Sequence, residues 1–155
     1  MTTAPVSISD RNLDAACTTV AGEIARTDSK ASLLLAFDGA VLAGLASIAA
    51  KDLPLISKVI GAAAIATLVA AAVLLLLVVR PNLGGRGRVV REGFPAWAQM
   101  DENTLHASLS EDTRLTRIAA LSTVAVTKYE RLARAVDVIL AALALLTIAA
   151  IGTLA

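Results

Sequence analysis

One acidic residue, Asp38, lies in an otherwise apolar stretch of the chain, and its chemistry is the first to need an explanation. The stretch runs from Ala31 to Ala50 and contains no other charged side chain. Twenty residues of α-helix span about 30 Å, the thickness of a bilayer's hydrocarbon core. An aspartate at mid-helix costs ~2.5 to 3.5 kcal/mol on insertion scales, so its carboxyl should face a partner or water. The stretch therefore predicts a membrane span with a polar contact.

Two interpretations of Asp38 are open from the sequence. In the functional one, several copies place their acids around a pore, or the acid acts as a protonatable switch. In the structural one, the carboxyl is protonated or hydrogen-bonded at a helix contact, with Thr67 or Thr147 as its partner.

Small side chains recur every fourth residue on two spans, beginning beside Asp38 at Gly39. Such stripes let membrane helices approach closely. Three spans with short side chains cannot enclose a pore alone, so we expect a homo-oligomer. The stripes consist of Gly39, Ala43 and Ser47 on the first span, and Ala62, Ala66 and Ala70 on the second.

Basic residues cluster just before the first and the last apolar stretch. The cations are Arg26, Lys30, Lys128, Arg131 and Arg134. At the membrane surface such residues commonly contact lipid headgroups or form an interfacial ion-pair network. The alternative is a pocket for an anionic ligand, for which these five side chains are the candidate contacts.

The composition favours a membrane protein and gives no sign of an active site. Of the 155 residues, 57% are hydrophobic and 17% are charged, with a mean hydropathy of +0.74. That apolar share exceeds the usual share of a soluble domain. The single cysteine, Cys17, excludes an intramolecular disulfide and a zinc site built on cysteines. The sequence shows no nucleophile or acid-pair constellation. We expect no enzyme activity, metal or cofactor.

Hydropathy and helical periodicity divide the chain into eight segments of an all-α integral membrane protein. The first and third spans are expected to continue from long cytosolic helices without a break. In order, the segments are a disordered tail (1–8), a cytosolic helix (9–30), the first span (31–50), an external loop (51–58), the second span (59–79), a basic cytosolic connector (80–102), a second cytosolic helix (103–137) and the third span (138–155).

The distribution of Lys and Arg predicts the orientation of the spans. Three precede the first span, nine lie between Arg80 and Arg134, and two lie in the loop between the first two spans. Basic residues concentrate on the cytosolic side of membrane proteins. We therefore expect a multi-pass protein of the inner (plasma) membrane, with a cytosolic N-terminus and an external C-terminus.

Three sequence elements, in order along the chain, resemble a known family. Asp28-Ser29-Lys30-Ala31 leads into Leu-Leu-Leu-Ala-Phe-Asp38-Gly39-Ala40, Arg80-Pro81 closes the second span, and Leu-Ser-Thr-Val-Ala-Val-Thr-Lys128-Tyr129 leads toward the third. Together they resemble the transmembrane effectors of bacterial Pycsar anti-phage systems, over nearly the whole chain from about Ile24. The family is expected to carry Asn where this chain has Asp38, so the resemblance does not extend a pore-acid role to it.

The resemblance implies an effector that answers a cyclic pyrimidine mononucleotide, cyclic UMP or cyclic CMP, made by a partner cyclase during infection. Such an effector impairs the inner membrane and stops the infected cell. Its expected partners are membrane lipid, the cyclic mononucleotide and further copies of itself, and not a nucleic acid polymer.

Two other functions remain open from the sequence. One is a structural membrane adaptor, for example in plasmid transfer, in which Asp38 serves packing alone. The other is a small proton-coupled carrier that uses Asp38. Three spans, few aromatic residues and a large cytosolic region disfavour the carrier.

Overall fold

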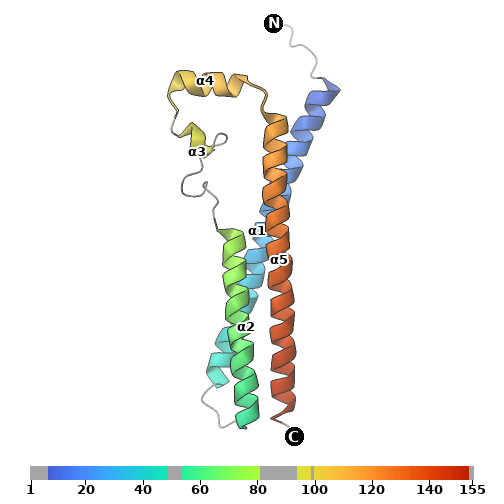
Figure 1. The fold of residues 1–155 in the computed structure, drawn as a ribbon, viewed down its shortest axis with the longest axis vertical. Coiled ribbons are helices and arrows are strands. Elements are labelled where there is room, and N and C mark those ends of the chain that lie inside the picture. The colour runs from blue at the N-terminus through green and yellow to red at the C-terminus, as the bar shows by residue number, and fades with distance from the viewer. Residues whose placement is uncertain (1–6, 49–53, 81–93, 99, 154–155) are drawn as a thin grey trace. The chain divides into compact units, whose positions relative to one another are not determined.

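The fold is all-helical throughout the residues that the structure describes. A computed structural model describes residues 7–48, 54–80, 94–98 and 100–153. These ranges contain helices and no strand, which confirms the predicted all-α class. The elements in chain order are α1 (Ile8–Ile48), α2 (Leu55–Val79), α3 (Phe94–Trp97), α4 (Glu102–Ser110) and α5 (Arg114–Ile151) (Figure 1).

Three of these helices, α1, α2 and α5, are long and apolar enough to cross a membrane. Their lengths are 41, 25 and 38 residues, against about 20 needed for a bilayer core. The prediction of three apolar spans is therefore confirmed.

Helix α2 starts earlier than the sequence predicted. The external loop was expected to extend to residue 58, but the helix begins at Leu55, directly after Pro54. Proline fixes φ near −65° and needs no backbone donor, so it suits the entry to a helix. At the other end, the N–H of Arg80 donates to the carbonyl of Leu76 and closes the last turn. Residues 49–53 of the loop lie outside the described residues.

The chain divides into two compact units, and both α1 and α5 contribute residues to each. Unit 1 comprises residues 1–24 and 81–125, and unit 2 comprises residues 25–80 and 126–155. Unit 1 therefore contains the beginnings of α1 and α5 together with α3 and α4. Unit 2 contains α2 and the apolar parts of α1 and α5.

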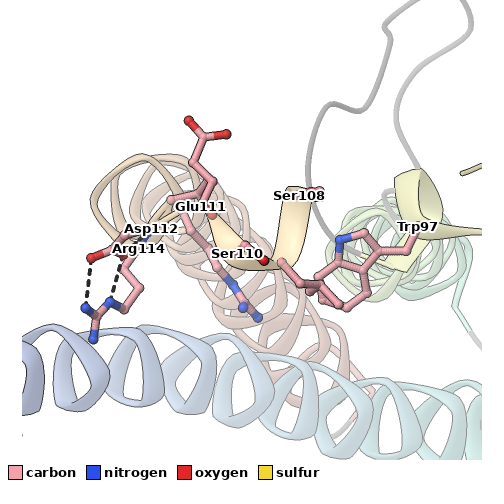
Figure 2. Close-up of a pocket in the computed structure, with 9 residues that line it drawn as sticks. Trp97, Ser108, Ser110, Glu111, Asp112 and Arg114 are labelled. Atoms are coloured by element: carbon pink, nitrogen blue, oxygen red, sulfur yellow. Dashed lines mark hydrogen bonds and ion pairs between the residues drawn. The ribbon is translucent and has the colours of Figure 1, made fainter. Parts of the chain in front are cut away.

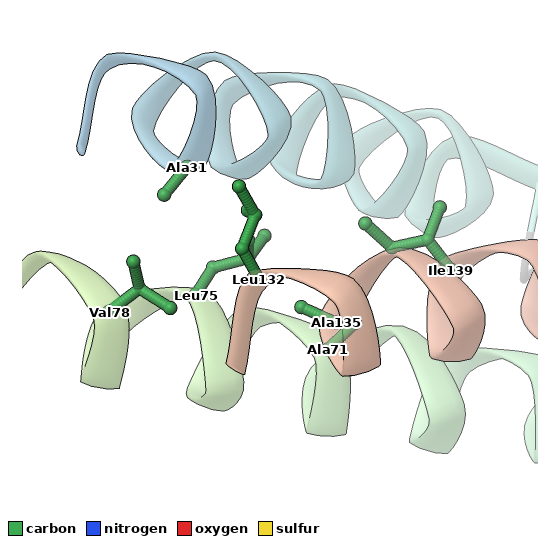
Figure 3. Packing of buried hydrophobic residues seen from close by; sticks show 7 residues of the cluster. All are labelled: Ala31, Ala71, Leu75, Val78, Leu132, Ala135 and Ile139. Carbon is green, nitrogen blue, oxygen red and sulfur yellow. The ribbon is translucent and has the colours of Figure 1, made fainter. Parts of the chain in front are cut away.

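Unit 2 is a three-helix bundle with a core of small and branched apolar side chains. Alanines in contact positions allow close approach of the backbones, and leucine and isoleucine fill the space between them (Figure 3). Leu75 and Val78 of α2 are fully buried in this core. The core cluster consists of Ala31, Ala71, Leu75, Val78, Leu132, Ala135 and Ile139.

In unit 1, α1 begins at Ile8, one residue before the predicted start at residue 9, and Ser7 caps it. The N–H of Asp10 donates to the Ser7 hydroxyl oxygen at 3.0 Å, and that hydroxyl donates to the Asp10 carboxylate at 2.6 Å. This reciprocal capping satisfies a backbone donor that the first turn leaves open.

The predicted uninterrupted helix over 103–137 is wrong, because α4 ends at Ser110 and α5 begins only at Arg114. Glu111 has the extended dihedrals φ −85° and ψ 135°. The Asp112 carboxylate then accepts a hydrogen bond from the N–H of Arg114 at 3.2 Å. Short polar side chains of this kind compete with the helix for backbone donors. The predicted basic connector lies largely outside the described residues, which omit 81–93.

Candidate functional site

Asp38 is fully buried in unit 2, and its carboxylate oxygens have no hydrogen-bond partner among the described residues. The predicted partners are wrong. The Thr67 hydroxyl donates to the carbonyl of Ala63, and the Thr147 hydroxyl donates to the carbonyl of Leu143, each at 2.8 Å. Threonine in a helix readily bonds its own preceding turn, which removes it as a partner for a neighbouring helix.

The two stripes of small side chains lie on the exposed faces of α1 and α2. Gly39, next to Asp38, is exposed, and a Cβ added there would meet nothing within 4 Å. The other stripe positions are exposed as well; they are Ala43, Ser47, Ala62, Ala66 and Ala70. The core of unit 2 uses different positions of the same helices, so the stripes are open to contacts outside the single chain.

Among the predicted ligand-binding cations, Lys128 is neutralised within the chain. Its ammonium donates to the Asp28 carboxylate at 2.5 Å. The side chains are 14% and 34% exposed, so this ion pair lies partly out of water. This contact brings together two of the family-like elements, Asp28-Ser29-Lys30-Ala31 and Lys128-Tyr129, which are 100 residues apart in the sequence.

The other four predicted cations do not converge on a single pocket in the structure. Arg131 donates to the carbonyl of Leu77 at 3.4 Å, near the C-terminal end of α2. Arg134 lies 3.9 Å from Glu130 on the same helix, with both side chains more than 60% exposed. Arg26 and Lys30 lie on α1, and both are exposed.

Of the remaining family-like positions, Arg80 ends α2 as described above, and Tyr129 is 42% exposed. Pro81 lies outside the described residues.

An ion-pair network around Arg114 joins α1 to the start of α5 in unit 1, and sequence reasoning did not identify it. The guanidinium bonds Asp10 at 2.5 Å, Asp14 at 3.1 Å and Asp112 at 2.8 Å. Nearby, the carbonyl of Arg114 lies 4.0 Å from the thiol sulfur of Cys17. The only signal in the sequence was the run of capping residues around Asp112, which marks a helix start.

The network shifts the pKa of Asp112, Asp10 and Arg114 in the direction that keeps each of them charged. A hydrogen bond from Arg114 lowers the pKa of Asp112 to about 2. The Ser7 hydroxyl and Arg114 lower the pKa of Asp10. The three carboxylates in turn raise the pKa of Arg114.

These shifts predict a loss of stability in acid. A carboxyl whose folded pKa is depressed stabilises the fold above its unfolded pKa, near 3.8, and this stabilisation is lost as the pH falls to the folded value. The melting temperature of the full-length protein in micelles should therefore fall between about pH 4 and pH 2. Arg114→Gln should lower the melting temperature at pH 7 and flatten this acid dependence. An equal acid dependence in both proteins would show that the network does not carry it.

Unit 1 also contains an open pocket of about 380 Å³, which lies between α3, α4 and the start of α5. Figure 2 shows the indole of Trp97 turned toward the segment that carries Ser108 and Ser110, while the carboxylate of Glu111 points away from it. Arg114 and Arg117 also line the pocket.

No metal centre is formed by the described ranges, since they contain no group of three or more His, Cys, Asp or Glu side chains that could hold an ion. Features of the described residues that could serve a function include the buried acid, the Asp28–Lys128 pair, the exposed small-residue stripes and the pocket at Trp97.

Three apolar helices of sufficient length and a helical unit rich in ion pairs define an all-helical membrane protein. The chain belongs to the Pycsar transmembrane effector family, because the PycTM model, described as the Pycsar effector protein domain, matches residues 12–155. This confirms the family resemblance found in the sequence, and the family is not a known enzyme family. Neither curated proteins nor solved structures gave a match.

Proposed function

We propose that this protein is the membrane effector of a Pycsar anti-phage system. It responds to a cyclic pyrimidine mononucleotide, cyclic UMP or cyclic CMP, made by a partner cyclase during infection, and then impairs the integrity of the inner membrane. The observation that carries the proposal is the family match over residues 12–155, together with three apolar helices in the same chain.

The resting bundle supports a mechanism in which activation changes the packing of the spans. Asp38 is fully buried, so the single chain offers no polar pathway at this position. A lesion therefore requires additional copies or a rearranged bundle. The exposed small-residue stripes beginning at Gly39 and Ala62 are the faces on which further copies can pack closely.

Both α1 and α5 contribute to unit 1 and to unit 2, so they are the elements through which a ligand could act on the spans. A ligand shifts such an equilibrium only by its differential affinity for the two states. We propose that unit 1 faces the cytosol, where the nucleotide is made. The C-terminus is then external, as the distribution of Lys and Arg predicts.

The proposal is tested by co-expressing the protein with a pyrimidine cyclase and measuring membrane potential and growth. Depolarisation and growth arrest should occur with the active cyclase and not with a catalytically inactive one. Depolarisation independent of the cyclase, or no effect with either form, would contradict the proposal. The adaptor alternative predicts neither transport nor toxicity. The carrier alternative predicts pH-coupled transport that Asp38→Asn abolishes.

A further inference from the structure

The pocket at Trp97 differs chemically from the membrane-edge cations that the sequence singled out. Its wall combines an aromatic face, a guanidinium and hydroxyl groups within one cavity. A volume of about 380 Å³ lies in the range of small-molecule sites, roughly 300 to 1,000 Å³. The membrane-edge cations, by contrast, are paired with Asp28 or Glu130 or lie dispersed on exposed helix faces.

The charges around the pocket leave one guanidinium available. Arg114 is bonded to Asp10, Asp14 and Asp112 and is fully compensated by these acids. The backbone N–H of Arg117 donates to the carbonyl of Thr113 at 2.9 Å, but its guanidinium has no hydrogen bond or ion pair with any residue in the described ranges. A guanidinium binds phosphate oxygens through two parallel N–H donors. The pocket therefore offers one cation to one anionic group.

The other polar groups of the pocket suit the edges of a base and a ribose. The hydroxyls of Ser108 and Thr113 have no partner within the described part of the chain. The Ser110 hydroxyl donates to the carbonyl of His106 at 2.8 Å, so its oxygen can still accept. The indole of half-buried Trp97 presents a face on which a base can stack.

We propose that this pocket binds the cyclic mononucleotide, with the base on Trp97 and the phosphodiester on Arg117. This inference rests on the proposed function for the identity of the ligand. A cyclic phosphodiester carries a single negative charge, which matches the single available guanidinium. The carboxylates of Glu111 and Asp112 beside the cavity disfavour linear nucleotides, whose phosphates carry more charge.

The pocket also adjoins the contact between α1 and α5. Arg114 lines the cavity and, through Asp10 and Asp14, holds the start of α5 against α1. A ligand bound beside Arg114 can therefore favour one arrangement of these two helix ends over another.

Binding to full-length protein in nanodiscs provides the test, because Trp97 is the only tryptophan in the chain. Titration with cyclic UMP and cyclic CMP should change its fluorescence, with calorimetry giving the dissociation constant. Arg117→Ala should weaken binding by about tenfold or more. Arg11→Ala removes an exposed arginine outside the pocket and should change the constant less than twofold.

Two further binding measurements test the stacking on Trp97 and the preference for a single negative charge. Trp97→Leu should weaken binding by about tenfold to a hundredfold, and Trp97→Phe should restore part of the loss, because phenylalanine keeps an aromatic face. Linear 5′-UMP should bind more weakly than cyclic UMP. Circular dichroism of each variant must match the wild type, so that a loss of binding is not a loss of fold.

The outcomes separate this site from the function on which it rests. If a nucleotide releases dye from liposomes but Arg117→Ala and Trp97→Leu bind it normally, the pocket is overturned and the function stands. If the nucleotide binds through Trp97 and Arg117 without dye release, the pocket stands and the membrane lesion is overturned. If the wild type binds no pyrimidine nucleotide, both are overturned.

Discussion

Replacing Asp38 with alanine is expected to stabilise the bundle of unit 2 by about 1–3 kcal/mol. The carboxyl is fully buried and has no hydrogen-bond partner among the described residues, so its removal relieves an uncompensated polar group. Reversible unfolding of the purified protein in mixed detergent micelles measures the change in the free energy of unfolding.

Asp38→Asn is the matched control, because it keeps the size and polarity of the side chain and should stabilise much less. If Asp38 is retained for activation, the alanine variant should also require more nucleotide to release dye. Destabilisation by Asp38→Ala would contradict the account, since it would mean that the carboxyl has a favourable partner in the assembled protein.

Breaking the Asp28–Lys128 ion pair is expected to destabilise the protein by about 1–3 kcal/mol. In Lys128→Met the Asp28 carboxylate loses its cation at a site that is only partly exposed. The upper figure applies to a well-shielded pair, and the 34% exposure of Asp28 reduces it by solvent screening. The same micelle unfolding experiment measures the loss.

A double-mutant cycle with Asp28→Asn isolates the pair itself, because the second substitution should cost little once the first is present. Arg134→Met serves as the matched control. Its contact with Glu130 is 3.9 Å long and exposed on both sides, so the expected change is below about 0.5 kcal/mol. Independent, additive effects of Lys128→Met and Asp28→Asn would contradict the assigned pairing.

The three apolar spans could be predicted because each is encoded locally, although α2 begins at Leu55 and not at residue 59. Runs of apolar residues specify α2 and the ends of α1 and α5, and Pro54 and Arg80 mark the limits of α2. The helical stripe of α1 is equally local. Leu13, Cys17, Val20 and Ile24 recur at helical spacing and are all at least half-buried.

Contacts across the chain could not be predicted in the same way. Arg114 pairs with Asp10 over 104 positions, and Lys128 pairs with Asp28 over 100. From the sequence alone, each of these charged residues is interpreted as part of a solvated helix face. The break at Glu111 was missed because a cluster of polar capping residues is a weaker signal than glycine or proline.

The pocket at Trp97 could not be predicted from the sequence either. Trp97 and Arg117 are 20 residues apart in the sequence and belong to different helices, and nothing in their spacing connects them. The sequence instead indicated the membrane-edge cations as candidate ligand contacts, because they lie directly beside the apolar spans. In the structure, Lys128 forms an ion pair with Asp28, so its charge is already neutralised within the chain.

The central claim is tested most directly by dye release from liposomes that contain the purified full-length protein. The liposomes are titrated with cyclic UMP and cyclic CMP, with cyclic AMP and cyclic GMP as controls. Release triggered by a pyrimidine nucleotide and by neither purine nucleotide is the predicted result. No release with any of the four, from protein shown to be folded and oriented, would contradict a nucleotide-gated membrane effector.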